Sequence, residues 1–174
     1  MDVILLNENT LKIKGKNASI IINPSTSTSK TEADAIILLK SDLSFNPDKI
    51  EGSRITIKGP GEYEISGVKI STTRVEEDQV ARVDVDNVKV LVGNGSAIEK
   101  IHDKIEEAQV VVINSDEEFN HSILTSLEPN VLLVYGAKRT EVAKSLGKDE
   151  AASASKYSTS SDKLPAEMEV ILLG

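Results

Sequence analysis

An uninterrupted apolar run at residues 35–39, with the sequence AIILL, constrains the fold of this 174-residue chain more than any other feature. Because apolar and polar residues do not alternate there, a strand formed by this run has no face suited to water. Such a strand belongs in the middle of a sheet that is covered on both sides. Residues 40–46 then turn polar, which predicts a loop that leaves the end of the buried strand.

The first half of the chain has the pattern of strands joined by tight turns. Short apolar runs predict an antiparallel meander over residues 2–23, with a hairpin turn at residues 15–17. Further along, Asp86 and Asn87 separate two valine-rich runs and predict another tight hairpin. We therefore expect strands to dominate up to Gly93.

The second half changes to a helical period. Apolar side chains recur at helical spacing over residues 96–108 and again over residues 115–127. Each segment begins with a serine that is followed three positions later by a glutamate, which is the spacing of a capping box. These pairs are Ser96 with Glu99 and Ser115 with Glu118.

Strands alternate with these helices toward the end of the chain. A short third helix is predicted to end at a C′ glycine, Gly147, and the serine-rich stretch after it is expected to be a surface loop with one short strand near Tyr157. The result is a βαβαβ order after an antiparallel half. We predict an α/β fold and a single domain over residues 1–174. The expected strands of the second half are residues 110–114, 130–136 and 167–173.

Composition argues against several classes of partner. The formal net charge of −8 is unfavourable for nucleic-acid binding, because affinity for a phosphate backbone comes largely from Lys and Arg. Without cysteine the chain has no disulfides and no thiolate metal site. No basic leader precedes the first apolar run, and no segment approaches the roughly 20 apolar residues of a membrane helix. We expect a cytoplasmic protein without nucleic-acid or membrane partners.

The order of these parts, with the stretches IINP and GPGEYEISGVKI, resembles the metallo-β-lactamase fold, and in particular its short zinc-hydrolase-like proteins. The resemblance covers nearly the whole chain. It implies a compact αββα sandwich with an antiparallel N-terminal half and a βαβαβ C-terminal half. It also implies that the loop after the buried strand stands where this group carries its His-x-His-x-Asp-His metal motif.

The residues at the metal-binding positions differ from that motif. In the loop, Lys40, Asp42, Ser44 and Phe45 stand where His, His, Asp and His are expected, so only Asp42 is a plausible ligand. The other positions differ as well. Glu8 stands near the usual first-turn His, and Asn23 replaces the Asp of IDP. Glu76 or Glu77 stands where a later His is expected, Asn94 replaces the bridging Asp, and Tyr135 and Gly136 fall at the last His.

These differences bear directly on metal chemistry. Zinc in a hydrolytic site needs at least three protein donors, usually imidazoles with a carboxylate, to lower the pKa of its bound water. The chain has only His102 and His121, each on an expected helix and without a second His nearby, so both are interpreted as surface residues. We therefore expect no zinc, no other cofactor and no catalytic residues.

The leading hypothesis is a non-catalytic metallo-β-lactamase-fold protein that acts as a binding or assembly module. One alternative is a hydrolase of a small ester or phosphate that uses the residual pocket without zinc or with a weakly held divalent ion. Another is a structural subunit of a homo-oligomer, and a homo-oligomer is the expected assembly in any case. The residues do not identify a small-molecule ligand.

A specific arrangement is predicted for the residual pocket. Lys40 would replace the positive charge of the metal and pair with the carboxylates of Glu8 and Asp42, while Phe45 would fold over the pocket and exclude water. The alternative is that Lys40 and Asp42 point into solvent from an ordinary surface loop. The predicted pocket consists of Glu8, Asn23, Lys40, Asp42, Ser44, Phe45 and Asn94.

Overall fold

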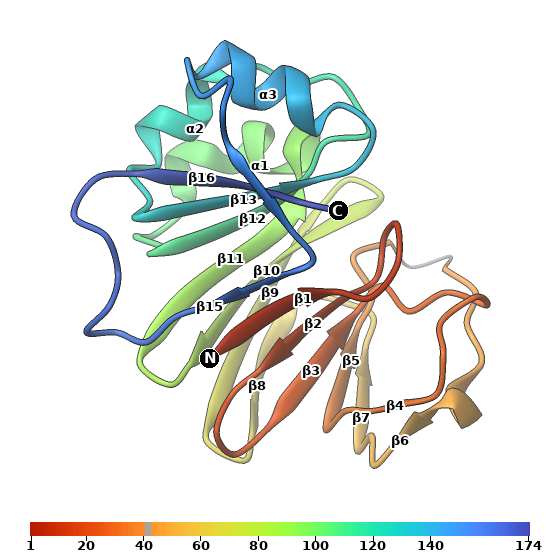
Figure 1. The fold of residues 1–174 in the computed structure, drawn as a ribbon. Helices are drawn as coiled ribbons and strands as arrows, with labels where there is room; N and C mark the ends of the chain where they lie inside the picture. Colours follow the sequence, from red (N-terminus) through yellow and green to blue (C-terminus); the bar gives the residue numbers. More distant parts are fainter. Residues whose placement is uncertain (41–42) are drawn as a thin grey trace.

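The computed structural model describes residues 1–40 and 43–174 of the chain. Within these residues, two large sheets pack face to face (Figure 1). The N-terminal sheet has the strand order β15-β1-β2-β3-β5-β7. Its strands are β1 (Asp2–Leu5), β2 (Leu11–Lys14), β3 (Ser19–Ile22), β5 (Ala35–Ile37), β7 (Ile55–Ile57) and β15 (Lys156–Ser158).

The second, C-terminal sheet combines an antiparallel and a parallel half. Its order is β14-β16-β13-β12-β11-β10-β9-β8, with β8 to β11 antiparallel and β11, β12, β13 and β16 parallel. The expected α/β class and βαβαβ order are therefore confirmed. Its strands are β8 (Gly61–Ile65), β9 (Val68–Val75), β10 (Asp78–Val85), β11 (Val88–Asn94), β12 (Val110–Asn114), β13 (Val131–Tyr135), β14 (Ala152–Ala154) and β16 (Glu169–Leu173).

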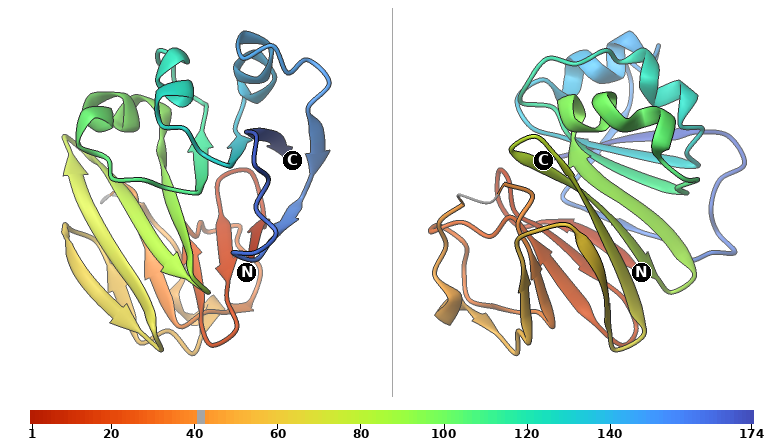
Figure 2. Two further views of the ribbon diagram at one scale, coloured as in Figure 1. Left: turned by 90° about the vertical axis from the view of Figure 1, so that its left-hand side faces the viewer. Right: turned by 180° about the vertical axis from the view of Figure 1, so that it is seen from behind.

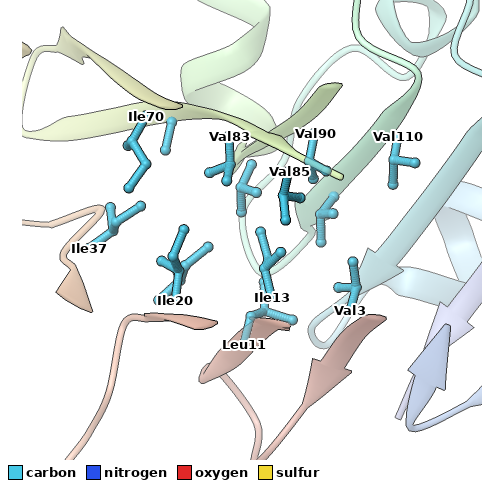
Figure 3. Packing of buried hydrophobic residues seen from close by; sticks show 14 of the residues in the cluster. Val3, Leu11, Ile13, Ile20, Ile37, Ile70, Val83, Val85, Val90 and Val110 are labelled. Carbon is cyan, nitrogen blue, oxygen red and sulfur yellow. The ribbon is translucent and has the colours of Figure 1, made fainter. Parts of the chain in front are cut away.

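The core between the sheets is aliphatic. Figure 3 shows side chains of the N-terminal sheet, such as Leu11 and Ile20, directed toward those of the C-terminal sheet, such as Val83 and Val90. The apolar run predicted to be central is central: β5 lies between β3 and β7, and residues 35–39 are all buried. Burial on both faces explains why this run does not alternate.

The α-helices cover the outer face of the C-terminal sheet (Figure 2). Ile98, Leu124 and Val142, one from each helix, pack with Leu91 and Val111 of the sheet in a second core cluster. Their stripes are what the helical spacing predicted, although the helices are shorter than the periodic segments. The helices are α1 (Gly95–Ile101), α2 (Ser122–Ser126) and α3 (Arg139–Ser145), and the 3-10 turn η2 (His102–Lys104) follows α1.

A smaller layer covers the outer face of the N-terminal sheet. It consists of the paired strands β4 (Thr31–Glu32) and β6 (Ile50–Glu51) and the 3-10 turn η1 (Pro47–Lys49). Ile50 from this layer packs on Ile21 and Ile36 of the sheet. In residues 1–40 and 43–174 the sandwich therefore carries its α-helices on one side, and turns and short strands cover the side where the resemblance implied a second helical layer.

Local turn chemistry was predicted well. Asp86 and Asn87 have φ angles of 52° and 62°, and they join β10 to β11 with Val85 paired to Val88, as in a two-residue hairpin with both central residues left-handed. Gly147 has a φ of 68°, and the N–H groups of Gly147 and Lys148 donate to the carbonyls of Lys144 and Ala143. This is the Schellman pattern of a C′ glycine.

Both predicted capping boxes are wrong. Asn94 is the N-cap of α1 and makes no side-chain capping bond, while the Ser96 hydroxyl donates to the carboxylate of Glu117. Ser115 lies far from the start of α2, and its hydroxyl donates to the carbonyl of Tyr135. In each case the serine finds a partner more than a helical turn away in sequence, which no local pattern reveals.

The last part of the chain connects the two sheets. After α3, β14 joins the C-terminal sheet beside β16, and β15 then joins the N-terminal sheet beside β1 before the chain returns as β16 (Figure 1). The short strand expected near Tyr157 is thus present as β15. None of the described helices has the length and apolar character needed to cross a bilayer.

Candidate functional site

Polar side chains collect where the parallel strands of the C-terminal sheet end. Asn94 at the end of β11 is in register with Asn114 at the end of β12, which is in register with Tyr135 at the end of β13. The first two are 8% and 9% exposed, and Tyr135 is fully buried. The carboxyl ends of parallel strands are where open α/β sheets place their ligand sites.

Asn94 is held by a carboxylate that the sequence did not single out. Its amide nitrogen donates to Oδ1 of Asp78, the first residue of β10, at 2.9 Å. Asp78 also lies 3.9 Å from the ammonium nitrogen of Lys40, and these two residues form an isolated β-bridge. The start of β10 and the segment after β5 therefore meet through this carboxylate.

Lys40 has a second carboxylate partner, Glu117. Its ammonium nitrogen lies 3.3 Å from Oε1 of Glu117, whose other oxygen accepts from the hydroxyl of Ser96 at 2.9 Å. The hydrogen bond from Ser96, followed by that from Lys40, lowers the pKa of Glu117. The carboxylate partners of Lys40 in the described residues are therefore Asp78 and Glu117, whereas the predicted partners were Glu8 and Asp42.

Asn23, which follows β3, forms hydrogen bonds to the end of β5 and the residues after it. Its side-chain oxygen accepts from the backbone N–H of Leu39 at 2.7 Å, its own N–H donates to the carbonyl of Ile37, and its carbonyl accepts from the hydroxyl of Thr10. Its φ is 49°, a left-handed conformation that Asn tolerates better than most residues. The residue at the Asp position of IDP therefore uses its acceptor inside the protein.

Gly136 occupies a position with no room for a side chain. Its φ is 101°, and a Cβ added there would lie 2.7 Å from Oδ1 of Asp116 and 3.1 Å from the backbone nitrogens of Ser115 and Asp116. Asp116 is fixed in this place because it accepts from Ala137 N–H at 2.8 Å and from the amide of Asn114 at 3.0 Å. A histidine cannot be accommodated at this position without a shift of the backbone.

Tyr135, the other residue at the last-histidine position, points into the core between the sheets. Burial is the main cause that raises the pKa of its phenol well above the usual value, and the charge of Asp116 acts in the same direction. The side chain therefore stays neutral over the physiological range.

Glu8 lines a cleft of about 660 Å³ next to this network. The cleft is bounded by the β1–β2 turn, the segment after β13 and the end of β16, and Figure 1 shows that turn beside the carboxyl end of β16. Gly136 and Asp116 also line it, so it lies against the position of the missing histidine. The remaining lining residues are Leu5, Leu6, Asn7, Asn9, Ala137, Arg139, Leu173 and Gly174.

The other predicted pocket residues are not all gathered here. Ser44 is exposed, and Phe45 packs with Leu43 against the outer face of the N-terminal sheet, which differs from its expected position over the pocket. Asp42 lies outside the described residues. The structure thus places Lys40 and Asn94 around the shared carboxylate of Asp78, Asn23 on the backbone of Leu39 beside Lys40, and Glu8 in the adjoining cleft.

The remaining candidates are engaged elsewhere. Glu76 accepts from Lys100 at 2.6 Å, and Glu77 is exposed in the β9–β10 turn. His102 contacts the carbonyl of Glu99, and His121 contacts the Ser145 hydroxyl, each at 2.7 Å.

The residues do not fit the zinc centre that the fold implies. In residues 1–40 and 43–174 there is no group of three or more His, Asp or Glu side chains placed to hold a metal ion. At the expected metal-ligand positions, the side-chain amides of Asn23 and Asn94 form hydrogen bonds to Leu39 and Asp78. The positive charge of Lys40, at a third such position, repels a cation. The donor set described here is therefore unsuited to zinc.

Comparison with known proteins identifies the fold. No family model and no curated protein matches the sequence. A metallo-β-lactamase superfamily protein from Thermotoga maritima, provisionally assigned as a zinc-dependent hydrolase, superposes with a TM-score of 0.76 over 99% of this chain and 98% of its own, at 15% identity. An isothiocyanate hydrolase from Delia radicum gut bacteria gives 0.62 over 92% and 100%, at 11% identity. The chain has the metallo-β-lactamase fold, as its motifs suggested.

Proposed function

We propose that this protein is a non-catalytic metallo-β-lactamase-fold protein that acts as a binding or assembly module. The observation that carries the proposal is the use of the fold's metal-ligand positions for internal contacts. Asn23 holds Leu39, Asn94 holds Asp78, Lys40 pairs with Asp78 and Glu117, and Gly136 leaves no space for a side chain.

The charges around Lys40 support this proposal. A carboxylate such as Asp78 in a partly buried place needs a compensating cation, and here the lysine ammonium supplies it. Asp78 is only 17% exposed, and the amide of Asn94 donates to the same oxygen that faces Lys40. Lys40 thus supplies one positive charge beside the two carboxylates of Asp78 and Glu117, at a place where a metal cation would otherwise supply it.

Metal analysis tests the proposal. Protein purified without chelators and without a metal-affinity step is expected to carry less than one zinc per chain by elemental analysis, and to leave generic lactam and phosphodiester substrates intact. The variant His102→Ala/His121→Ala removes both imidazoles of the chain and serves as the control for adventitious surface zinc. One or more zinc ions per chain that resist dialysis in this variant would overturn the proposal, and hydrolysis by metal-free protein would favour an enzyme that uses the pocket without zinc.

Assembly is the second part of this proposal. The homo-oligomer expected from the sequence stays a prediction, and light scattering is its measurement. A molar mass that is a multiple of 18.8 kDa at micromolar concentration supports it, whereas a mass of 18.8 kDa throughout that range contradicts it.

A further inference from the structure

The cleft beside Gly136 has the size and the composition of a small-molecule site. Its volume of about 660 Å³ falls within the usual range of ligand pockets, roughly 300–1,000 Å³. One wall is apolar: Leu6 is 40% exposed there and Leu5 is partly buried, with the fully buried Leu173 behind them. Leu6 and Leu5 offer a surface that a ligand's hydrocarbon part would cover.

A positively charged group is held on another wall. The Nη1 of Arg139 donates to the carbonyl of Gly136 at 3.1 Å, which fixes the guanidinium at the first residue of α3. Within residues 1–40 and 43–174, Arg139 forms no ion pair, so its remaining donors are available to a ligand. A guanidinium is suited to bind a carboxylate through two parallel hydrogen bonds.

Negative charge lies on the side of the cleft formed by the β1–β2 turn and the segment after β12. Asp116 is committed to Ala137 and Asn114, but its charge remains. Glu8 is exposed and, in the part of the chain that the structure describes, forms no side-chain hydrogen bond. An anion alone would be repelled by these carboxylates, whereas a ligand that also carries a cation would be attracted.

We infer that this cleft binds a small zwitterion with an apolar side chain, that is, an α-amino acid or a short peptide. Arg139 receives its carboxylate, Glu8 receives its ammonium group with Asp116 adding to the negative potential, and Leu5 and Leu6 cover its hydrocarbon part. This inference rests on the proposed function for one point, namely that the protein binds a ligand without converting it to a product.

Calorimetric titration with L-leucyl-L-leucine tests the inference on the full chain. We expect saturable binding with a dissociation constant below about 1 mM, as ligand efficiency allows for a molecule of this size. Leucyl-leucinamide, which lacks the carboxylate, and N-acetyl-leucyl-leucine, which lacks the ammonium group, should each bind more weakly. The loss should be larger for the amide, about tenfold or more, because Glu8 is solvent-exposed and its ion pair is screened.

Variants assign each charged group of the ligand to its partner. Arg139→Gln should lower the affinity for the parent peptide about tenfold, so that this variant binds the parent and the amide equally well. Glu8→Gln should bind the parent and the acetylated peptide equally well. The matched controls are Arg74→Gln and Glu64→Gln, which change exposed residues that line a different groove, and they should bind as the unaltered protein does.

Three results would overturn the inference. The first is no heat of binding up to about 10 mM peptide in protein whose folding is verified by circular dichroism. The second is equal affinity for all three peptides, and the third is an affinity for the parent peptide that Arg139→Gln leaves unchanged. Each can be obtained whatever the zinc content proves to be, so a failure here is distinguishable from a failure of the non-catalytic proposal.

Discussion

The ammonium group of Lys40 lies 3.3 Å from a carboxylate oxygen of Glu117, although 77 residues separate them in the sequence. Lys40 follows the buried strand of the N-terminal sheet, and Glu117 follows a strand of the C-terminal sheet, so the pair spans the two halves of the sandwich. Because Lys40 is 41% and Glu117 54% exposed, the pair itself adds little to stability. Its role is to place a fixed positive charge among carboxylates at the strand ends.

The pKa of Glu117 reports on this network. It is lowered from the usual 4.5 by the hydrogen bond from Ser96 and then by the hydrogen bond and the charge of Lys40, so Ser96→Ala and Lys40→Met should each raise it. Since the folded-state pKa is the lower one, the stabilisation is fully present above pH 4.5 and is lost as pH falls below 4.5 through the folded-state value. A carbon-detected NMR titration of the carboxyl group measures the shift.

Lys138→Met is the matched control for that titration. It removes the partner that lowers the pKa of Glu118 and should leave the pKa of Glu117 unchanged. A Glu117 pKa that is the same in Ser96→Ala, Lys40→Met and the unaltered protein would contradict the predicted network.

Placing a side chain at the former histidine position should destabilise the protein. Gly136→Ala puts a Cβ 2.7 Å from Oδ1 of Asp116 in a left-handed conformation, and Gly136→His adds an imidazole to the same place. We expect losses of about 2 kcal/mol or more in the free energy of unfolding, measured with urea. Gly147→Ala, where φ is also positive but no atom lies within 4 Å, should cost about 1 kcal/mol. Equal losses in Gly136→Ala and Gly147→Ala would refute the steric argument.

Substitutions of Asn23 test whether the residue at this position of the motif stabilises the fold through its hydrogen-bond acceptor. Asn23→Ala removes the acceptor of the Leu39 N–H and leaves a Cβ-bearing residue at a φ of 49°, so a loss of about 2 kcal/mol is expected. Asn23→Asp restores the residue of the IDP motif and keeps an acceptor, so its stability should stay within about 1 kcal/mol of the unaltered protein. Chemical denaturation compares the two, and an aspartate as damaging as alanine would show that the acceptor is not what matters.

The central strand, the β10–β11 hairpin and the end of α3 were predictable because each depends on neighbours in sequence. The physical cause of each feature is local in the sequence: an apolar run without alternation, an Asp86–Asn87 pair and a C′ glycine, Gly147. The start of α2 was not predictable: the segment from Ser115 onward has helical spacing, but the Ser115 hydroxyl binds the Tyr135 carbonyl and the helix begins only at Ser122.

The candidate site was predicted only at the positions that the family motif names. The resemblance pointed to Lys40 and Asn94, which share the partner Asp78, and to Asn23, which bonds the neighbouring Leu39 instead. It gave no signal for Asp78 or Glu117. Those two carboxylates reach Lys40 through tertiary packing, and charged residues in a turn look like ordinary solvated surface. Phe45 shows the reverse error, since an aromatic residue near a site need not cover it.

The contact between Gly95 and Phe119 leads to the last prediction. Gly95 is the first residue of α1, and a Cβ there would lie 2.7 Å from Cγ of the buried Phe119 ring. Gly95→Ala is therefore expected to cost about 1–3 kcal/mol through overpacking. Phe119→Leu in the same chain should recover part of that loss, because the two substitutions share one space and are not additive. Gly59→Ala, where the nearest atom would be 3.9 Å away and belongs to the flexible end of Arg74, is the control and should be neutral or slightly stabilising. Urea unfolding of Gly95→Ala, Phe119→Leu and the double variant measures the coupling. Strictly additive losses would mean that the ring yields and that α1 does not depend on this contact for its position.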